Sequence, residues 1–253
     1  MARTVTLITG ASAGLGAEFA RQCARRGEAL ALAARRRDRL EALQGVLGGD
    51  VHVFEADLAK PGAGMRLIEQ LAAEGIEVGT LINNAGFGLS GRFEAQEPER
   101  QIDMIDLNVR ALTELCRAVL PQMRARGSGA ILNVASTAAF QPGPNMAVYY
   151  ATKAYVLSLT EALHEEMKGS GIRVTALCPG PTETEFFDVA AITGGVLRRI
   201  AGDPVSVVRE GLDGLDRGKA IVIPGGRNKA GAQAYRFMPR AAMRRFMARL
   251  KAE

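Results

Sequence analysis

The chain has 253 residues, of which 47% are hydrophobic and 23% charged, and this composition excludes a disordered, collagen-like or disulfide-stapled protein. No apolar run approaches the roughly 18–20 residues that span a bilayer, and from the first residues we expect no secretion signal. The three cysteines are far apart in apolar contexts, which predicts reduced, mostly buried thiols and a cytoplasmic protein.

The net charge of +5 is concentrated at the end of the chain. Residues 227–253 contain eight arginines or lysines and one glutamate, so this segment carries +7 and residues 1–226 carry −2. A slightly acidic body does not indicate a nucleic-acid-binding fold, and we expect no nucleic-acid partner. We therefore treat 1–226 as one domain and 227–253 as a basic C-terminal extension.

Short segments rich in β-branched residues alternate with longer helical patterns along the first 226 residues. They predict seven strands, at 4–9, 29–34, 51–55, 78–82, 129–135, 172–177 and 219–223, and helices that begin near 14, 36, 61, 97 and 147. This alternation predicts an α/β fold: a single, doubly wound Rossmann-type domain whose seven-stranded parallel sheet has helices on both faces. Segment 184–217 is too long for a simple connection, and we expect it to cover the ligand crevice as a substrate lid.

A glycine-rich turn follows the first predicted strand and precedes a helix; it reads Thr9-Gly10-Ala11-Ser12-Ala13-Gly14-Leu15-Gly16. Glycines let the backbone approach a pyrophosphate closely, and the helix N-terminus offers free N–H groups. The same letters contain the G-x-S-x-G pattern of serine hydrolases. That alternative is disfavoured because only nine residues precede Gly10, and because both histidines, His52 and His164, lie within predicted regular elements. His164 starts an HExxH-like sequence without the second histidine, so no metal site is expected.

The end of the second predicted strand indicates which dinucleotide binds. An NAD site places an acidic residue roughly 20 residues after the glycines, but this chain has Arg35, Arg36 and Arg37 there. The Arg35 guanidinium can bind a 2′-phosphate bidentately, and the Ser12 hydroxyl can donate a further hydrogen bond. Because basic residues in a first helical turn oppose the helix dipole, an anionic partner is a better explanation than a solvated helix start. We therefore predict NADP(H) as the cofactor.

Tyr149 and Lys153 are four residues apart in a predicted helix, so their side chains share one face. A free phenol has a pKa of about 10, and a neighbouring ammonium favours the phenolate and lowers that pKa. The pair therefore predicts a tyrosine that exchanges a proton with a carbonyl or an alcohol. Ser136, which follows a predicted strand, can hydrogen-bond the same substrate oxygen.

These motifs together resemble the classical short-chain dehydrogenase/reductase family, from residue 4 to about 185 and in the family's order. The resemblance rests on the glycine turn, Asp57-Leu58, Asn83-Asn84-Ala85-Gly86, Asn108, Ser136 thirteen residues before Tyr149, Lys153, and Pro179-Gly180 with Thr184 beyond it. It implies the catalytic residues Asn108, Ser136, Tyr149 and Lys153. Together with the arginine argument, it implies the cofactor-binding residues Gly10, Ser12, Gly14, Leu15, Gly16, Arg35, Asp57, Leu58, Asn84, Ala85, Gly86, Tyr149, Lys153, Pro179, Gly180, Thr182 and Thr184.

The family's roles imply a specific chemistry. Tyr149 is the general acid and base, Lys153 lowers its pKa and holds the nicotinamide ribose, Ser136 orients the substrate oxygen, and Asn108 keeps a water in the proton relay. Hydride passes between the nicotinamide and a carbonyl or alcohol carbon. We expect an apolar substrate of the ketone, 3-oxoacyl or hydroxy-acid type. The alternative is a catalytically silent NADP-binding regulatory protein on the same fold.

The C-terminal extension departs from the family pattern. Apolar residues recur there at three- and four-residue steps, with arginines on the other faces; they include Tyr235, Phe237, Met238, Met243, Phe246, Met247 and Leu250. Three interpretations are open: an amphipathic helix docked on the domain or a partner subunit, a helix lying on an anionic membrane surface, or a nucleic-acid contact. From the family we also expect a homodimer or homotetramer that pairs through the helices at 97–125 and 147–169.

Overall fold

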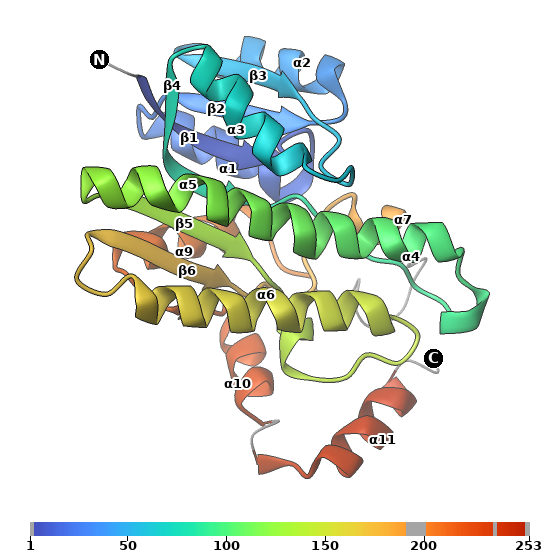
Figure 1. Ribbon diagram of the computed structural model, residues 1–253. Helices are drawn as coiled ribbons and strands as arrows, with labels where there is room; N and C mark the ends of the chain where they lie inside the picture. The colour runs from blue at the N-terminus through green and yellow to red at the C-terminus, as the bar shows by residue number, and fades with distance from the viewer. Residues whose placement is uncertain (1–2, 191–200, 235–236, 251–253) are drawn as a thin grey trace.

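Seven parallel strands form one sheet in the order β3-β2-β1-β4-β5-β6-β7, and this confirms the predicted fold class (Figure 1). The computed structural model describes residues 3–190, 201–234 and 237–250. The strands are β1 (Arg3–Thr9), β2 (Leu30–Ala34), β3 (Val51–Glu55), β4 (Ile76–Asn83), β5 (Gly129–Val134), β6 (Ile172–Leu177) and β7 (Ile221–Val222). Each overlaps a strand predicted from the sequence.

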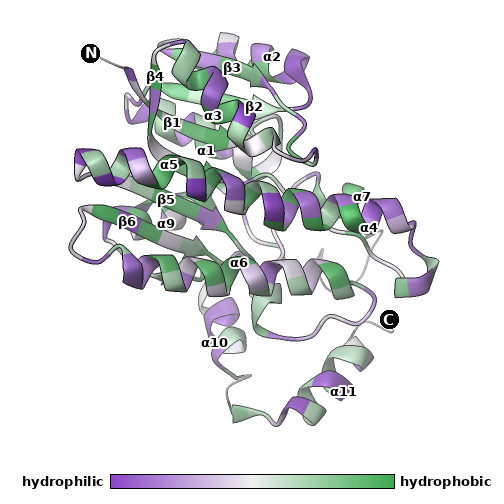
Figure 2. Ribbon diagram, viewed as in Figure 1, coloured by the Kyte–Doolittle hydropathy of each residue, from purple (hydrophilic) through white to green (hydrophobic). Residues whose placement is uncertain are grey.

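Helices cover both faces of the sheet, because side chains alternate between the two faces along each strand. In β1, Leu7 packs in the core under α3 (Ala63–Ala73), α5 (Leu112–Arg126) and α6 (Ala147–Glu166). The next residue, Ile8, packs in the core under α1 (Gly14–Arg25), α2 (Arg37–Leu47) and α9 (Pro204–Asp216). The strands are largely green in Figure 2, whereas α5 and α6 alternate green and purple along their length, as amphipathic helices do.

The strand order reverses between β1 and β4, and Asn84 fastens the ends of these two strands together. Its Nδ2 donates to the carbonyl oxygens of Thr9 at 2.9 Å and Gly10 at 3.3 Å. The Thr9 hydroxyl in turn accepts from the backbone N–H groups of Asn84 at 3.1 Å and Ala85 at 3.0 Å. In an open α/β sheet this reversal is where a crevice opens at the carboxyl ends of the strands.

Segment 184–217, which the sequence predicts to be a substrate lid, contains two different structures. Residues 204–216 form α9, which starts with Pro204 at its first position and with the Asp203 carboxylate accepting from the N–H groups of Val205 and Ser206. Its apolar face packs against the sheet beside α1, as a connecting helix does. The portion that precedes it contains the short helix α7 (Phe186–Val189). Residues 191–200 lie outside the described residues.

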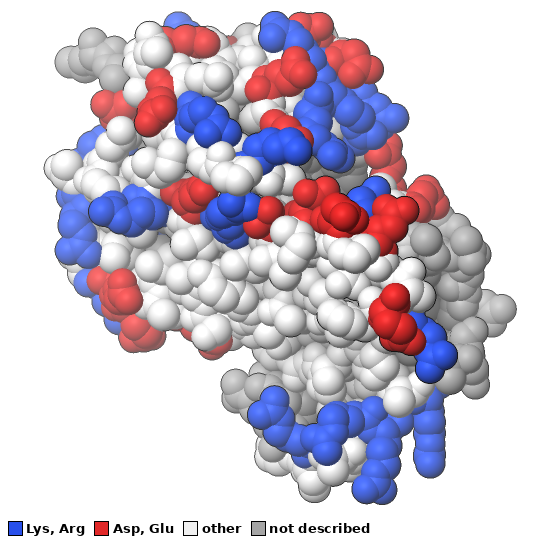
Figure 3. Space-filling view, turned by 45° about the vertical axis from the view of Figure 1, so that its right-hand side comes forward, with Lys and Arg blue, Asp and Glu red and all other residues white. Residues whose placement is uncertain are grey.

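The C-terminal extension forms α10 (Gly226–Ala234) and α11 (Arg240–Leu250), which lie below the layered domain in Figure 1. Met243 and Met247 of α11 are buried, while its arginines are exposed and form a continuous basic surface, shown in blue at the bottom of Figure 3. Tyr235 lies outside the described residues. Among the described helices, none is long and apolar enough to cross a membrane.

The three cysteines, Cys23, Cys116 and Cys178, are free and buried, as predicted. Burial raises the pKa of the Cys116 and Cys178 thiols to about 12. Because the thiolate is the reactive form of cysteine, these residues serve as packing groups.

Candidate active site

A cavity of about 1480 Å³ opens at the carboxyl ends of the strands. It is lined by the glycine turn, the end of β2, the segments after β3, β4, β5 and β6, the start of α6, and residues of α10 and α11. All the residues proposed from the sequence line it except Gly16 and Asn108, which are buried directly behind it. The candidate residues therefore share one cavity although they are spread over 175 positions, from Gly10 to Thr184.

Two glycines of the turn, Gly10 and Gly16, are required for steric reasons. Gly10 has a φ of +66°, and a Cβ there would lie 2.9 Å from the Cα of Ala85. A Cβ on Gly16 would lie 2.2 Å from the carbonyl oxygen of Gly10. Helix α1 then begins at Gly14 with no side-chain cap, so its first N–H groups have no side-chain acceptor and face the cavity end of the strand.

The start of α6 carries Tyr149 and Lys153 on one helical face, as predicted. The buried Lys153 ammonium donates to the carbonyl oxygen of Val134 at 2.8 Å and lies 5.8 Å from the centroid of the Tyr149 ring. Ser136 follows β5 in extended conformation, and its hydroxyl accepts from the N–H of Ala138 at 3.1 Å and donates to the Pro179 carbonyl at 3.4 Å. Tyrosine, lysine and serine thus come from α6 and the end of β5 to one end of the cavity.

The protonation of this group differs from the prediction that Lys153 lowers the pKa of Tyr149. Burial raises the pKa of the Tyr149 phenol, and the contact with Ser136 opposes that rise only in part. Burial also lowers the pKa of the Lys153 ammonium to about 8. The physical reason is that the Lys153 ammonium donates to the Val134 carbonyl and not to the phenol oxygen of Tyr149. The effect of desolvation on the phenol pKa is therefore larger than the effect of the ammonium charge.

Asn108 supports the loop after β4 from a π-helical segment, Asp106–Ala111, that joins α4 (Pro98–Ile105) to α5. Its side chain is 1% exposed. The Oδ1 atom accepts from the N–H of Phe87 at 3.1 Å, and Nδ2 donates to the Phe87 carbonyl at 2.9 Å and the Thr152 hydroxyl at 3.1 Å. The extra residue of a π turn often marks a functional position, and here it places the amide between the loop and α6.

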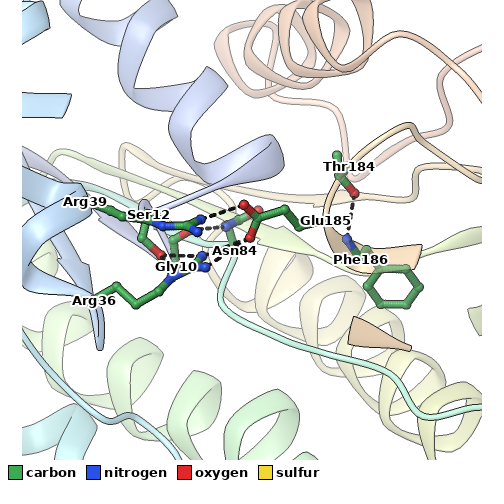
Figure 4. A network of polar contacts seen from close by, with 8 residues as sticks. All are labelled: Gly10, Ser12, Arg36, Arg39, Asn84, Thr184, Glu185 and Phe186. Carbon is green, nitrogen blue, oxygen red and sulfur yellow. Dashed lines mark hydrogen bonds and ion pairs between the residues drawn. The ribbon is translucent and has the colours of Figure 1, made fainter. Parts of the chain in front are cut away.

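A cluster of charged side chains lies at the opposite end of the cavity (Figure 4). Arg36 donates to the Ser12 hydroxyl at 3.1 Å and to the Glu185 carboxylate at 3.1 Å, and Arg39 donates to the other oxygen of Glu185 at 2.6 Å. The hydrogen bond from Arg39 and then the Arg36 guanidinium hold the pKa of the Glu185 carboxyl below its usual range. Arg35 lines the same end of the cavity and pairs with no described residue.

The rest of the cavity is walled mostly by apolar side chains. Phe186 packs on the Tyr149 ring with a centroid distance of 5.3 Å. Helix α11 and the residue that precedes it by two positions close the far side with four side chains: Met238, Met243, Phe246 and Met247. The C-terminal extension therefore docks on the chain's own cavity, which is the first of the three arrangements predicted for it.

Comparison with known proteins decides the family. A family model described as short chain dehydrogenase matches residues 4–191. This chain belongs to the short-chain dehydrogenase/reductase family. Sulfoacetaldehyde reductase 2 of Chromohalobacter salexigens is 39% identical to it over 200 residues, which cover 76% of this chain and 77% of that protein.

Two solved structures extend the likeness into the C-terminal region. A short-chain dehydrogenase from Sphingobium yanoikuyae, solved in complex with NADPH, is 38% identical, with a TM-score of 0.82 and coverage of 93% of this chain and 94% of that one. The bulky-bulky ketone specific alcohol dehydrogenase from Comamonas testosteroni is 33% identical, with a TM-score of 0.78 and coverage of 93% and 92%. The chain is thus a short-chain dehydrogenase/reductase, an NAD(P)-dependent oxidoreductase that acts on CH–OH groups.

The serine hydrolase alternative has no support in the geometry of this family member. His52 bonds to Arg3 and Asp50 at the sheet edge, and His164 bonds to the Val174 carbonyl. Neither histidine lines the cavity that contains Ser12. Among the described residues there is also no group of three side chains suited to a metal ion.

Sequence reasoning missed three kinds of cavity residue. It chose Arg35 for an anion, whereas Arg36 is the arginine that contacts Ser12. It assigned no role to Arg39 or Glu185, whose sequence separation of 146 residues leaves no local signal. The methionines of α11 had a detectable signal, their helical spacing, but that spacing does not show which surface they cover.

Proposed function

We propose that the protein is an NADP(H)-dependent carbonyl reductase or alcohol dehydrogenase for bulky, mostly apolar substrates of the ketone, 3-oxoacyl or hydroxy-acid type. One observation carries the proposal: Tyr149, Ser136 and Lys153 meet at the apolar end of a cavity whose other end gathers arginines. The alternative, a silent cofactor-binding protein, is less well supported because the four residues required for proton transfer are all present around that cavity.

The residues around the cavity fit a dinucleotide. The turn at Gly10 and Gly16 leaves no room for side chains beside the uncapped start of α1, which suits a pyrophosphate. The end of β2 offers Arg35 and Arg36, with Ser12 adjacent, which suits a 2′-phosphate. Asp57 and Leu58 line the cavity where an adenine would be held. The relative that was solved with NADPH supports the same cofactor.

The chain's own residues would then manage one proton. When bound, the nicotinamide supplies or accepts the hydride. In reduction, the Tyr149 hydroxyl donates its proton to the carbonyl oxygen while Ser136 hydrogen-bonds that oxygen and fixes its position. The raised pKa leaves the phenol protonated near neutral pH, but it also makes the phenol a weaker acid, so proton transfer depends on stabilisation of the developing phenolate by the neighbouring positive charge of Lys153. Lys153 supplies a positive charge 5.8 Å from the centroid of the Tyr149 ring and would hold the ribose, and Asn108 would keep the loop and the proton relay in place.

Tyr149→Phe tests the assignment of the acid. The variant should lose at least about a thousandfold in kcat, within the range that general acid catalysis and substrate orientation supply together. Its Kd for NADPH should stay within about twofold of the wild type, because the ring remains and only the hydroxyl is lost. Val148→Ala, one residue earlier, is the matched control and should retain turnover. Turnover of Tyr149→Phe at the wild-type rate contradicts the proposal.

The cofactor assignment is tested separately by fluorescence titration. Arg35→Ala and Arg36→Ala should each weaken NADPH binding by about tenfold and NADH binding by less than about twofold, because only NADPH carries the phosphate. Arg37→Ala is the matched control, since Arg37 pairs with Glu41 on the surface. Equal losses for both cofactors contradict a phosphate-binding role.

The substrate class rests on the walls of the cavity. Phe186, Phe187, Val189 and Met146 line it together with α11, so a bulky apolar group gains about 25 cal/mol for each Å² that it buries. The ketone-specific relative supports this class, whereas the sulfoacetaldehyde reductase represents small charged substrates. A panel of aryl ketones, 3-oxoacyl thioesters, hydroxy acids and sulfoacetaldehyde, followed by NADPH absorbance, distinguishes the two. We expect kcat/KM to be highest for the aryl ketones.

We also propose a homodimer or homotetramer. Ile102 and Ile105 of α4 and Tyr155 of α6 are exposed, with exposures of 57%, 39% and 41%, on the helices that were expected to pair. Ile102→Glu should shift the mass measured by light scattering toward the monomer. Peripheral membrane contact is less well supported, because Met243 and Met247 face the cavity and are unavailable to lipid. Cosedimentation with anionic vesicles tests it, and we expect none at physiological salt.

A further inference from the structure

The Glu185 carboxylate lies in the position where an anion would be bound by Arg36, which follows β2, and by Arg39 in the first turn of α2. It comes from the segment after β6, and its two oxygens accept separately from Arg39 at 2.6 Å and from Arg36 at 3.1 Å (Figure 4). The same Arg36 guanidinium donates to Ser12, the residue of the glycine turn that faces this end of the cavity. The carboxylate therefore occupies donors that a phosphate on the cofactor's ribose would need.

The local charge shows that the Glu185 carboxylate does not neutralise the arginines around it. Arg36 and Arg39 contribute two positive charges and Glu185 one negative charge, while the adjacent Arg35 pairs with no described residue. A phosphate monoester carries a charge of about −1.5 to −2 near neutral pH and has three strong acceptor oxygens, against one charge and two oxygens for a carboxylate. The site therefore favours the phosphate over the carboxylate in charge and in number of acceptors.

The ion pairs are weak enough to exchange. The side chains of Arg36, Arg39 and Glu185 are 42–45% exposed, so water and salt screen their attraction. Because Glu185 is tethered, however, it competes at an effective concentration on the order of millimolar. A competitor of this kind lowers the affinity of a phosphate ligand without abolishing its binding.

A displacement of Glu185 would also affect the substrate end of the cavity. Glu185 immediately precedes Phe186, whose ring packs on Tyr149. Phe187, the next residue, is 3% exposed and lines the same cavity. The segment that would be released from the arginines is therefore the one that forms part of the substrate wall.

We propose that Glu185 is a cofactor-selectivity residue: its carboxylate competes with the 2′-phosphate of NADP(H) for Arg36 and Arg39, and NAD(H), which lacks that phosphate, leaves the ion pairs intact. This rests on the proposed binding of NADP(H). Glu185 thereby lowers the affinity for NADP(H) to a moderate value and links phosphate binding to the position of Phe186.

The test is a pair of charge-neutralising variants of the full-length chain. Glu185→Gln removes the competitor, and Glu183→Gln is the matched control, because Glu183 is an exposed glutamate two residues away with no ion pair in the structure's described part. Dissociation constants of NADPH, NADH, adenosine 2′,5′-bisphosphate and 5′-AMP are measured by calorimetry at low and at physiological salt.

Glu185→Gln should tighten NADPH and adenosine 2′,5′-bisphosphate by about three- to tenfold, the range that a pair of exposed ion pairs supports. NADH and 5′-AMP should change by less than about twofold, and Glu183→Gln should change none of the four. Weaker NADPH binding in Glu185→Gln would mean that Glu185 clamps a bound cofactor, and equal tightening in both variants would mean a general charge effect; either result overturns the proposal.

Failure of this proposal is distinguishable from failure of the proposed function. If the wild-type chain binds NADPH no more tightly than NADH, the assignment of NADP(H) is wrong. If it prefers NADPH and Glu185→Gln leaves that preference unchanged, only the competition by Glu185 is wrong. Thermal melting of both variants should match the wild type, because the substituted side chains are on the surface.

Discussion

The two ends of the cavity are built from different kinds of contact. We call the end at Tyr149, Ser136 and Lys153 the inner end, and the end at Arg36, Arg39 and Glu185 the outer end. At the inner end, Lys153 and Asn108 are 6% and 1% exposed, and each is held by hydrogen bonds to backbone or buried partners. At the outer end, the Arg36, Arg39 and Glu185 side chains remain nearly half exposed to solvent. Buried polar contacts are costly to break, whereas exposed ion pairs contribute about 0–1 kcal/mol each.

This difference indicates that the two ends have different tasks: the inner end holds groups in fixed positions, and the outer end exchanges a ligand. The inner end keeps reacting groups in position on α6, β5 and the π-helical segment, and every substrate meets the same arrangement. The outer end has to release and rebind a charged cofactor, for which weak, solvated contacts are suited. Changes at the inner end should therefore have large effects on rate and stability, and changes at the outer end should have smaller effects on affinity.

Among the variants that test this comparison, the largest effect is expected for Asn108→Ala. Removing this amide leaves the N–H and carbonyl of Phe87 without their partners, at a cost of about 1–3 kcal/mol in the free energy of unfolding. We also expect kcat to fall by about a hundredfold, because the loop after β4 loses its connection to Thr152 on α6. Urea denaturation and NADPH absorbance measure the two quantities.

Thr113→Val is the control for that variant. Thr113 lies on the same helical stretch, but its hydroxyl bonds to the Val109 carbonyl and to the exposed Tyr155 hydroxyl, away from the cavity. Thr113→Val should lower the free energy of unfolding by less than about 1 kcal/mol and leave kcat unchanged. If the two variants lose activity alike, Asn108 acts only through general destabilisation.

Lys153→Met should alter how stability depends on pH. The Lys153 ammonium has a pKa of about 8 in the folded chain against 10.5 when exposed, so between these values the unfolded chain binds more protons than the folded one. The burial of the Lys153 ammonium therefore lowers the free energy of unfolding fully below pH 8, and this cost disappears as pH rises toward 10.5. The difference between the two pKa values corresponds to about 3 kcal/mol.

The measurement is the unfolding free energy of wild type minus that of Lys153→Met at pH 7, 8, 9 and 10. Subtraction removes the opposite trend from Tyr149 and the cysteines, whose raised pKa values make both proteins less stable at high pH. The difference should shift in favour of the wild type as pH rises. A difference that stays flat across this range would show that the ammonium is not desolvated.

The inner end was largely predictable from the sequence because its signals are local. Tyr149 and Lys153 share a helical face, and Ser136 follows a buried strand. The boundaries of β3 and β6 agree with the predicted ranges, since β-branched residues recur in both strands and turn-forming residues lie nearby, Gly49-Asp50 before β3 and Gly171 and Pro179 on either side of β6. Even α9, which falls within the predicted lid, has a detectable pattern, with Asp203 as its cap and Val207, Val208, Leu212 and Leu215 at helical spacing.

The outer end was not predictable in this way. Glu185 reaches Arg36 and Arg39 only after the chain has passed through four more strands, and nothing near residue 185 in the sequence specifies that partner.

The pKa of Tyr149, at the inner end, was predicted with the wrong sign because sequence spacing shows which groups are close but not how much water they lose. Long-range pairing and desolvation are properties of the packed molecule.

The smallest expected effect separates the apolar face of α11, which closes the far side of the cavity, from the basic surface of the same helix. Met247 is 6% exposed and lines the cavity, whereas Arg244, nearly one turn earlier on α11, is exposed to solvent. Met247→Ser should raise KM for a bulky aryl ketone by about tenfold, since it removes apolar surface worth about 1.5 kcal/mol, and should leave KM for a small aldehyde unchanged. Arg244→Ala should change neither value. If Met247→Ser raises both KM values equally, α11 supports the fold of the cavity rather than contacting the far part of a large substrate.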